Sequence, residues 1–135
     1  MSNSALDAYS TAPILTADPV TLTSMLFDGA LKAMRKARRL HESGNRQGFI
    51  DETGRAQLIV GELLATLDLS QGEVARNLSG VYAYCLRNLV ECTLGDLSKL
   101  AEAEKHIGRV AEAWKSATQQ LRASAASAGS VEAAA

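Results

Sequence analysis

The distribution of proline constrains the fold of this chain more than any other sequence feature. Its only two prolines are Pro13 and Pro19, so the rest of the chain is free of the strongest helix breaker. Apolar residues recur in that part at alternating steps of three and four, which is the spacing of one face of an α-helix. We therefore expect an all-α fold with four long helices after an N-terminal arm.

The first helix is expected to run from the Asp18-Pro19 pair to about Ser43. Asp18 supplies an N-cap oxygen, proline suits the first helical position, and Gly44 suits a left-handed stop. Its apolar residues form two stripes, so the helix needs neighbours on two sides. We assign Leu22, Met25, Leu26, Gly29, Ala33, Ala37 and Leu40 to one stripe and Phe27, Ala30, Leu31 and Met34 to the other.

Three further helices are expected over about 46–68, 71–94 and 97–122. Asn45 is the predicted cap of the second, and Ser70 with Glu73 has the spacing of a capping box for the third. Gly54 and Gly61 either weaken the second helix by about 1 kcal/mol each or mark a close approach of two helices. Connections of two to four residues make successive helices antiparallel.

The predicted architecture is an antiparallel up-down-up-down four-helix bundle. Residues 1–17 form an N-terminal arm, residues 18–122 the bundle, and residues 123–135 a disordered tail without an apolar seam. The N-terminus lacks the basic and apolar regions of a signal peptide, and no stretch is apolar enough to span a bilayer. We therefore expect a cytoplasmic protein without membrane insertion.

Composition argues against several classes of function. The formal net charge is -1 and the pI about 6.1, so the chain has no overall positive electrostatic potential that would favour binding to nucleic acid. The Glu-x-x-His motif of di-metal bundles is missing, because Ala103 precedes His106 and Arg38 precedes His41 by three residues. Phosphate-binding glycine loops and Cys-x-x-Cys pairs are also missing. We therefore expect that the protein is not an enzyme and that it binds neither a cofactor nor a metal ion.

Three features remain open between a structural and a functional interpretation. Cys85 and Cys92 lie seven residues apart and are interpreted as buried thiols, with redox or metal binding as the alternative. Trp114 is interpreted as core, with a partner-facing anchor as the alternative. A basic run is either a solvated helix face or a contact for an acidic protein surface or, more weakly, for nucleic acid, although no aromatic residues interleave it. It contains Lys32, Arg35, Lys36, Arg38, Arg39, His41 and Arg46.

Several segments occur in the order and spacing of a known family. Residues 8–10 (AYS), 17–19 (ADP) and 22–31 (LTSMLFDGAL) resemble the opening of FliS proteins, whose pattern includes L-x-x-M-L-Y-D-G-A. Residues 59–63 (IVGEL), 67–68, 72–75 (GEVA), 77–78, 81–84 (VYAY) and 112–114 (EAW) follow the same family pattern. The resemblance covers about residues 8–116. Phe27 departs from the usual tyrosine, and residues 90–93 depart from a stretch rich in alanine and asparagine.

The resemblance implies a flagellar secretion chaperone. Such a protein binds the C-terminal segment of flagellin, prevents its premature polymerisation and assists its delivery to a component of the export gate. The apolar candidates for the flagellin groove are Ile50, Leu64, Tyr82, Leu86 and Leu89, each with plain core as the alternative. Leu6, Tyr9 and Ile14 are the candidate lid over that groove. Whether the free chain forms a weak homodimer stays open. The alternative functions are a generic helical interaction or regulatory module and a metal- or cofactor-binding four-helix bundle.

Overall fold

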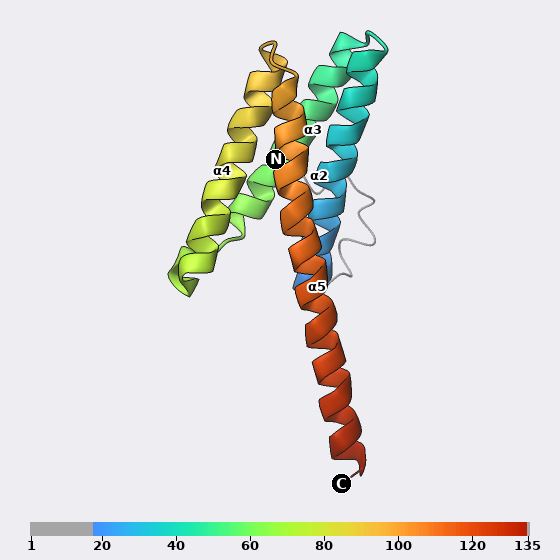
Figure 1. The fold of residues 1–135 in the computed structure, drawn as a ribbon, viewed down its shortest axis with the longest axis vertical. Helices are drawn as coiled ribbons and strands as arrows, with labels where there is room; N and C mark the ends of the chain where they lie inside the picture. Colours follow the sequence, from blue (N-terminus) through green and yellow to red (C-terminus); the bar gives the residue numbers. More distant parts are fainter. Residues whose placement is uncertain (1–17, 135) are drawn as a thin grey trace.

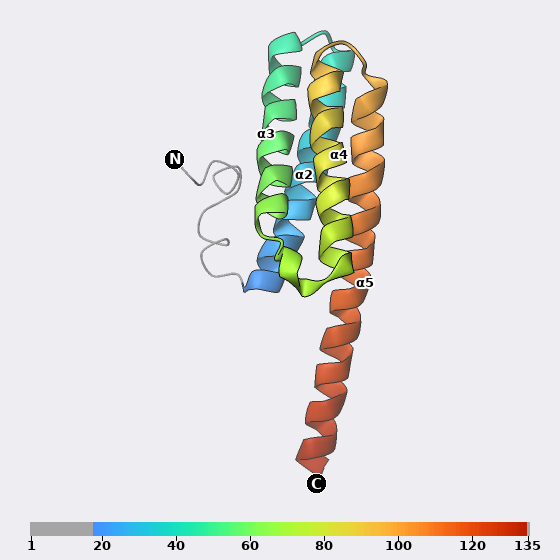
Figure 2. The ribbon, with the colours of Figure 1, turned by 90° about the vertical axis from the view of Figure 1, so that its left-hand side faces the viewer.

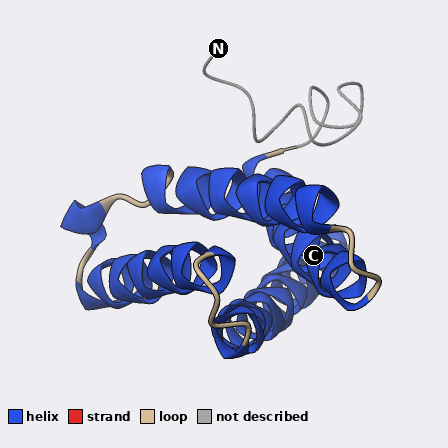
Figure 3. Cartoon of the chain, turned by 90° about the horizontal axis from the view of Figure 1, so that it is seen from above, coloured by secondary structure: helices blue, strands red, loops and turns tan. Residues whose placement is uncertain are grey.

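The computed structural model describes the backbone of residues 18–134 and the side chains of residues 18–128. Four long helices and one short 3₁₀-helix make up this part: α2 (Pro19–Glu42), α3 (Arg46–Ala65), η2 (Leu69–Gln71), α4 (Glu73–Thr93) and α5 (Ser98–Ala134). Figure 3 shows only helices and short loops over this range. None of the described helices combines the length and the apolar character needed to cross a bilayer.

The helices form the predicted up-down-up-down bundle, in which α2 contacts α3 and α5, and α4 contacts the same two helices (Figure 1). A single core lies between them. Its largest fully buried side chains include Phe49, Leu26, Met34, Ile59, Leu63, Leu89, Leu100 and Ile107. The wide apolar surface of α2 packs towards both of its neighbours, as its two stripes predict.

Local capping sets most of the helix boundaries. The Asp18 carboxylate accepts a hydrogen bond from the Thr21 amide at 2.7 Å, and this bond lowers the pKa of the carboxyl group. The Asn45 side chain accepts a hydrogen bond from the Gly48 amide at 2.9 Å. Gly44 has φ 80°, the left-handed conformation expected after a helix end. The predicted starts of the first two helices are therefore confirmed.

The predicted capping box at Ser70 and Glu73 is wrong. The Ser70 hydroxyl donates to the Asp68 carboxylate at 2.6 Å, and the Ser70 amide donates to the same oxygen at 3.0 Å. These bonds form η2 instead of capping the next helix. Gly72, with φ 108°, is the N-cap of α4 and makes no side-chain cap, so α4 begins at Glu73.

The last helix continues past its predicted end at about residue 122 and reaches Ala134. Figure 2 shows this part of α5 projecting beyond the other helices. Thr118 is the last buried residue, and every described side chain from residue 119 to 128 is exposed. Alanine has the highest helix propensity, so this segment continues the helix although its described side chains, up to residue 128, are not buried against the bundle.

Candidate partner-binding site

The outer face of α3 carries a stripe that alternates large apolar side chains with glycine. We name Ile50, Gly54, Leu58 and Gly61 the α3 stripe; steps of four, four and three place them on one side of the helix. Ile50 is 37% and Leu58 50% exposed. A Cβ built on either glycine meets nothing within 4 Å. Among the described residues, the two glycines therefore do not mark a close approach of two helices, and no described side chain fills the space above them.

The flank of α4 next to α3 continues this apolar surface. Tyr84 packs edge-on against His106 of α5, with ring centroids 5.3 Å apart, so that side of α4 faces α5. Leu86 lies two residues further on and points to the opposite flank, towards α3, with Val90 one turn later. Val90 is 48% exposed. The α3 stripe and Val90 therefore present exposed apolar side chains on two helices that contact each other, and the partly buried Leu86 lies one turn before Val90.

The five predicted groove residues divide by burial. Ile50 is exposed, whereas Leu64 and Leu86 are partly buried and pack against the core. Tyr82 and Leu89 are 3% and 0% exposed, so they belong to the core and present no surface to a partner here. The Tyr82 ring lies 6.5 Å from that of Phe27 on α2, and burial raises the pKa of its hydroxyl to about 12.

The candidate lid residues Leu6, Tyr9 and Ile14 lie outside the described residues. The first described residue, Asp18, is the N-cap of α2. The lid therefore stays a prediction from the sequence.

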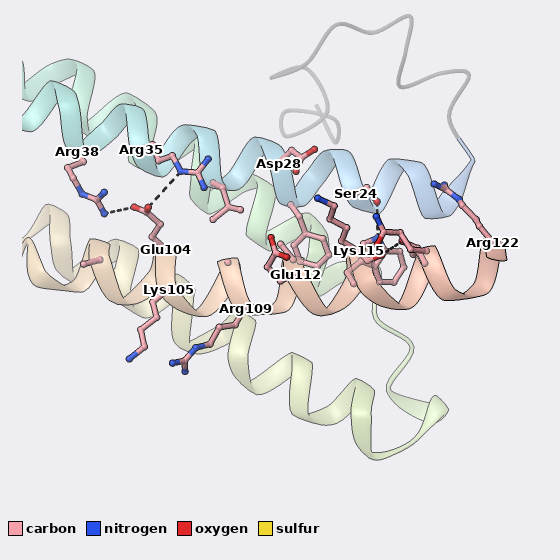
Figure 4. A pocket seen from close by; sticks show the side chains of 18 residues that line it. Ser24, Asp28, Arg35, Arg38, Glu104, Lys105, Arg109, Glu112, Lys115 and Arg122 are labelled. Carbon is pink, nitrogen blue, oxygen red and sulfur yellow. Dashed lines mark hydrogen bonds and ion pairs between the residues drawn. The ribbon is translucent and has the colours of Figure 1, made fainter. Parts of the chain in front are cut away.

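A cleft of about 1110 Å³ lies between α2 and α5. Phe27, Leu31, Gly108, Ala111 and Trp114 are among its small and apolar lining residues, and most of the others are charged. Figure 4 shows Arg35 and Arg38 reaching from α2 to Glu104 on α5. The Arg38 guanidinium donates to the Glu104 carboxylate, and the Arg35 Nε lies 3.8 Å from the same group.

Trp114 lines this cleft and is held in place by contacts with α2. Its indole N–H donates to the Ser24 hydroxyl at 2.9 Å, and its ring centroid lies 6.2 Å from that of Phe27. The tryptophan is partly buried and packs against the core, as its structural interpretation predicts. Trp114 is nevertheless among the residues that line the cleft, so a ligand bound there would change the environment of the indole.

Much of the basic run is paired within the chain. Besides the two arginines on Glu104, the Lys36 amine lies 3.5 Å from the carboxylate of Glu52, a residue that is 7% exposed. The Arg46 guanidinium donates to the Thr93 carbonyl at 3.5 Å. These contacts connect α2 to α5 and α3, and α3 to the end of α4, so the run has a structural role.

The two thiols are buried on α4. Burial raises the pKa of both Cys85 and Cys92 to about 11, so each is a neutral thiol near pH 7. The Cys85 thiol donates to the Ala103 carbonyl at 3.9 Å. In the part of the chain with described side chains, no cluster of three or more histidine, cysteine, aspartate or glutamate residues is arranged to hold a metal ion. Both thiols are free and buried, as their structural interpretation predicts.

Sequence reasoning missed Leu58, Val90 and the α2–α5 cleft. A signal for Leu58 was available, because it lies four residues after Gly54 and eight after Ile50. The cleft has no comparable signal, since it joins side chains separated by 66 and 90 positions.

Comparison with known proteins identifies a family model and several relatives that this chain matches. The model of the family described as Flagellar protein FliS matches residues 1–121. The flagellar secretion chaperone FliS of Salmonella typhimurium is 37% identical over 105 residues, 76% of this chain and 78% of that protein. The protein of the same name from Bacillus subtilis is 34% identical over 116 residues, 85% of this chain and 86% of that protein. The one from Escherichia coli is 33% identical over 105 residues, 76% and 77% of the two chains. The chain therefore belongs to the FliS family of flagellar secretion chaperones.

Proposed function

We propose that this protein binds the C-terminal segment of flagellin in the cytoplasm, prevents its premature polymerisation and assists its export. Membership of a family of flagellar secretion chaperones supports a flagellar export substrate as the partner. The α3 stripe is the observation that carries the proposal within the structure. It offers a guest helix the exposed apolar side chains of Ile50 and Leu58, with Gly54 and Gly61, which have no side chains, beside them.

The physical requirement on such a site is strict. A flagellin tail that is unordered alone loses several kcal/mol of conformational free energy when it folds on the chaperone. Burial of apolar surface returns about 25 cal/mol per Å², so a helix must cover a long strip of the chaperone. Close approach at Gly54 and Gly61 increases the area that one guest helix buries against α3. Leu64 and Leu86 extend the contact towards α4, while Tyr82 and Leu89 support it from the core.

We further propose that the N-terminal arm covers this surface in the free chaperone through Leu6, Tyr9 and Ile14. Shielding apolar surface in this way limits self-association to a weak homodimer. Delivery to the export gate then follows flagellin binding and requires no catalytic step. Deletion of residues 1–15 tests the arm: unchanged self-association and unchanged flagellin affinity would contradict it.

Calorimetry tests the main proposal. A peptide copying the C-terminal segment of flagellin from the same organism is titrated into the full chain, and a second peptide carries serine at its apolar positions. We expect heat and saturable binding only with the first peptide. Replacement of Leu58 by serine on the chaperone should weaken binding, whereas replacement of the exposed Leu121, which lies on α5, should not. Equal affinity of the two peptides would refute the proposed apolar contact.

A further inference from the structure

The α2–α5 cleft carries a local charge opposite to that of the chain. Six basic side chains line it, together with three carboxylates, so its formal charge is +3. The whole chain has a net charge of -1, which leaves -4 for everything outside the cleft. The basic residues are Arg35, Arg38, Lys105, Arg109, Lys115 and Arg122. This concentration on one face creates a local positive potential that the overall pI conceals.

Half of these cations form no ion pair within the part of the chain that the structure describes. Arg35 and Arg38 share Glu104, and the charge of Arg122 contributes to lowering the pKa of Asp18. Lys105, Arg109 and Lys115 form no ion pair with any described residue, and all three side chains are exposed. Their positive charge is therefore available to a partner.

The shape of the cleft suits an elongated guest. Its lining on α5 runs from Ala101 to Arg122, which corresponds to about 30 Å of helix. Gly108 lies within this stretch, and a Cβ built on it meets nothing within 4 Å, so a guest can approach the α5 backbone there. Leu31 and Trp114 give the cleft an apolar floor beneath its charged rim.

We propose that this cleft is a second docking site, which binds an acidic amphipathic helix of a partner protein. The apolar face of the helix lies on the floor, and its carboxylates face Arg109, Lys115 and their neighbours. The site is separate from the flagellin surface proposed above, because that surface lies on α3 and α4 and this cleft on α2 and α5 (Figure 4). The chaperone therefore has room for a second partner while its first surface is occupied.

Two other occupants fit the same cleft less well. Single-stranded nucleic acid binds through exposed aromatic faces, but the Trp114 ring packs against Phe27 and its N–H is bonded to Ser24. Residues 1–17 of this chain contain a single charged side chain, Asp7, so they offer little to a strongly basic rim. Charge complementarity thus favours an acidic protein segment.

Trp114 makes the proposal directly testable, because it is the only tryptophan of the chain and lines the cleft. The probe is a synthetic helical peptide of about 20 residues with leucine on one face and glutamate on the other. A matched peptide carries lysine at every glutamate position, and an oligothymidylate represents nucleic acid. We expect the acidic peptide alone to shift the Trp114 emission saturably, with an affinity that falls as salt is added.

Charge reversal locates the binding. Arg109→Glu and Lys115→Glu should each weaken the acidic peptide about three- to tenfold, since each converts an attraction into a repulsion. Arg76→Glu makes the same charge change on the exposed part of α4 and should leave the affinity within twofold. A saturating flagellin peptide should not displace the acidic peptide, which separates this proposal from the flagellin site. Circular dichroism shows whether each variant is folded. The comparison of the acidic peptide with the lysine peptide uses the unaltered chain, so it does not depend on the variants.

Several results would overturn the proposal. The lysine peptide or the oligothymidylate binding as tightly as the acidic peptide would remove the charge argument. Equal weakening by Arg76→Glu would place the contact outside the cleft. An affinity gain of tenfold or more on deletion of residues 1–17 would identify this chain's own N-terminal segment as the natural occupant.

Discussion

Replacing Gly54 or Gly61 by alanine should stabilise the free chaperone. Both positions lie inside α3, neither has a positive φ, and a Cβ at either meets no atom within 4 Å. An alanine methyl therefore causes no clash, and the helix gains about 0.8–1 kcal/mol per substitution from propensity alone. For a domain of this size that corresponds to an increase in Tm of about 3–5 °C each, measured by thermal unfolding.

The same substitutions should weaken flagellin binding. If a guest helix packs over the α3 stripe, the added methyl group occupies the space that its backbone or side chains require. Overpacking of a closely fitted contact costs about 1–3 kcal/mol, so we expect the Kd of the flagellin peptide to rise about five- to hundredfold. Stability and affinity thus change in opposite directions, which a general structural defect does not produce.

Gly80 provides the matched control. It lies inside α4, is exposed, and a Cβ built there also meets nothing within 4 Å. It is two residues from the buried Tyr82, so it lies on the side of α4 away from the core. Gly80→Ala should raise the Tm by a similar amount and leave the flagellin affinity unchanged. Unchanged flagellin affinity in both α3 variants would show that the guest helix does not pack over the α3 stripe. A lower Tm in these variants would show that the added methyl group clashes with the rest of the chain.

Three further predictions concern the bundle itself. Leu89→Ala removes a side chain that is 0% exposed and should lower the free energy of unfolding by about 2–5 kcal/mol in urea titrations. Ser24→Ala removes the acceptor of the Trp114 N–H and should cost about 1 kcal/mol, with a change in tryptophan emission. Because burial raises the pKa of Cys85 and Cys92 from 9.0 to about 11, the stability they contribute is complete below pH 9. It should decrease as the pH rises towards 11, by up to about 3 kcal/mol for each thiol, measured by urea unfolding at several pH values.

Each of these has a result that contradicts it. If Leu89→Ala were as stable as the unaltered chain, the core would have closed around the missing side chain without a loss of free energy of unfolding. Unaltered tryptophan emission of Ser24→Ala would show that the Trp114 indole does not donate to Ser24. For the thiols, a variant with alanine at both cysteine positions should lose less stability between pH 9 and 11. The same loss in that variant would assign the pH dependence to other groups.

Much of the fold follows from interactions between residues close in the chain. The N-caps at Asp18 and Asn45 and the left-handed Gly44 involve contacts within five residues, so their chemistry is visible in the sequence. The spacing of the apolar residues likewise predicts the helix faces that meet in the core, because the period of the helix is fixed. The capping box at Ser70 failed for a local reason, since Ser70 lies in the short helix η2 capped by Asp68, and Gly72 is the N-cap of α4.

The sequence by itself therefore determined four helices, their antiparallel order and the family to which the chain belongs. Only the tertiary structure decided which apolar residues are covered: Leu89 is buried and Leu58 exposed, although both lie in amphipathic helices. It also brought Arg38 to Glu104 and Trp114 to Ser24 and opened the cleft between α2 and α5. Helix periodicity fixes the direction of each side chain around its own axis, whereas exposure depends on where the neighbouring helices lie.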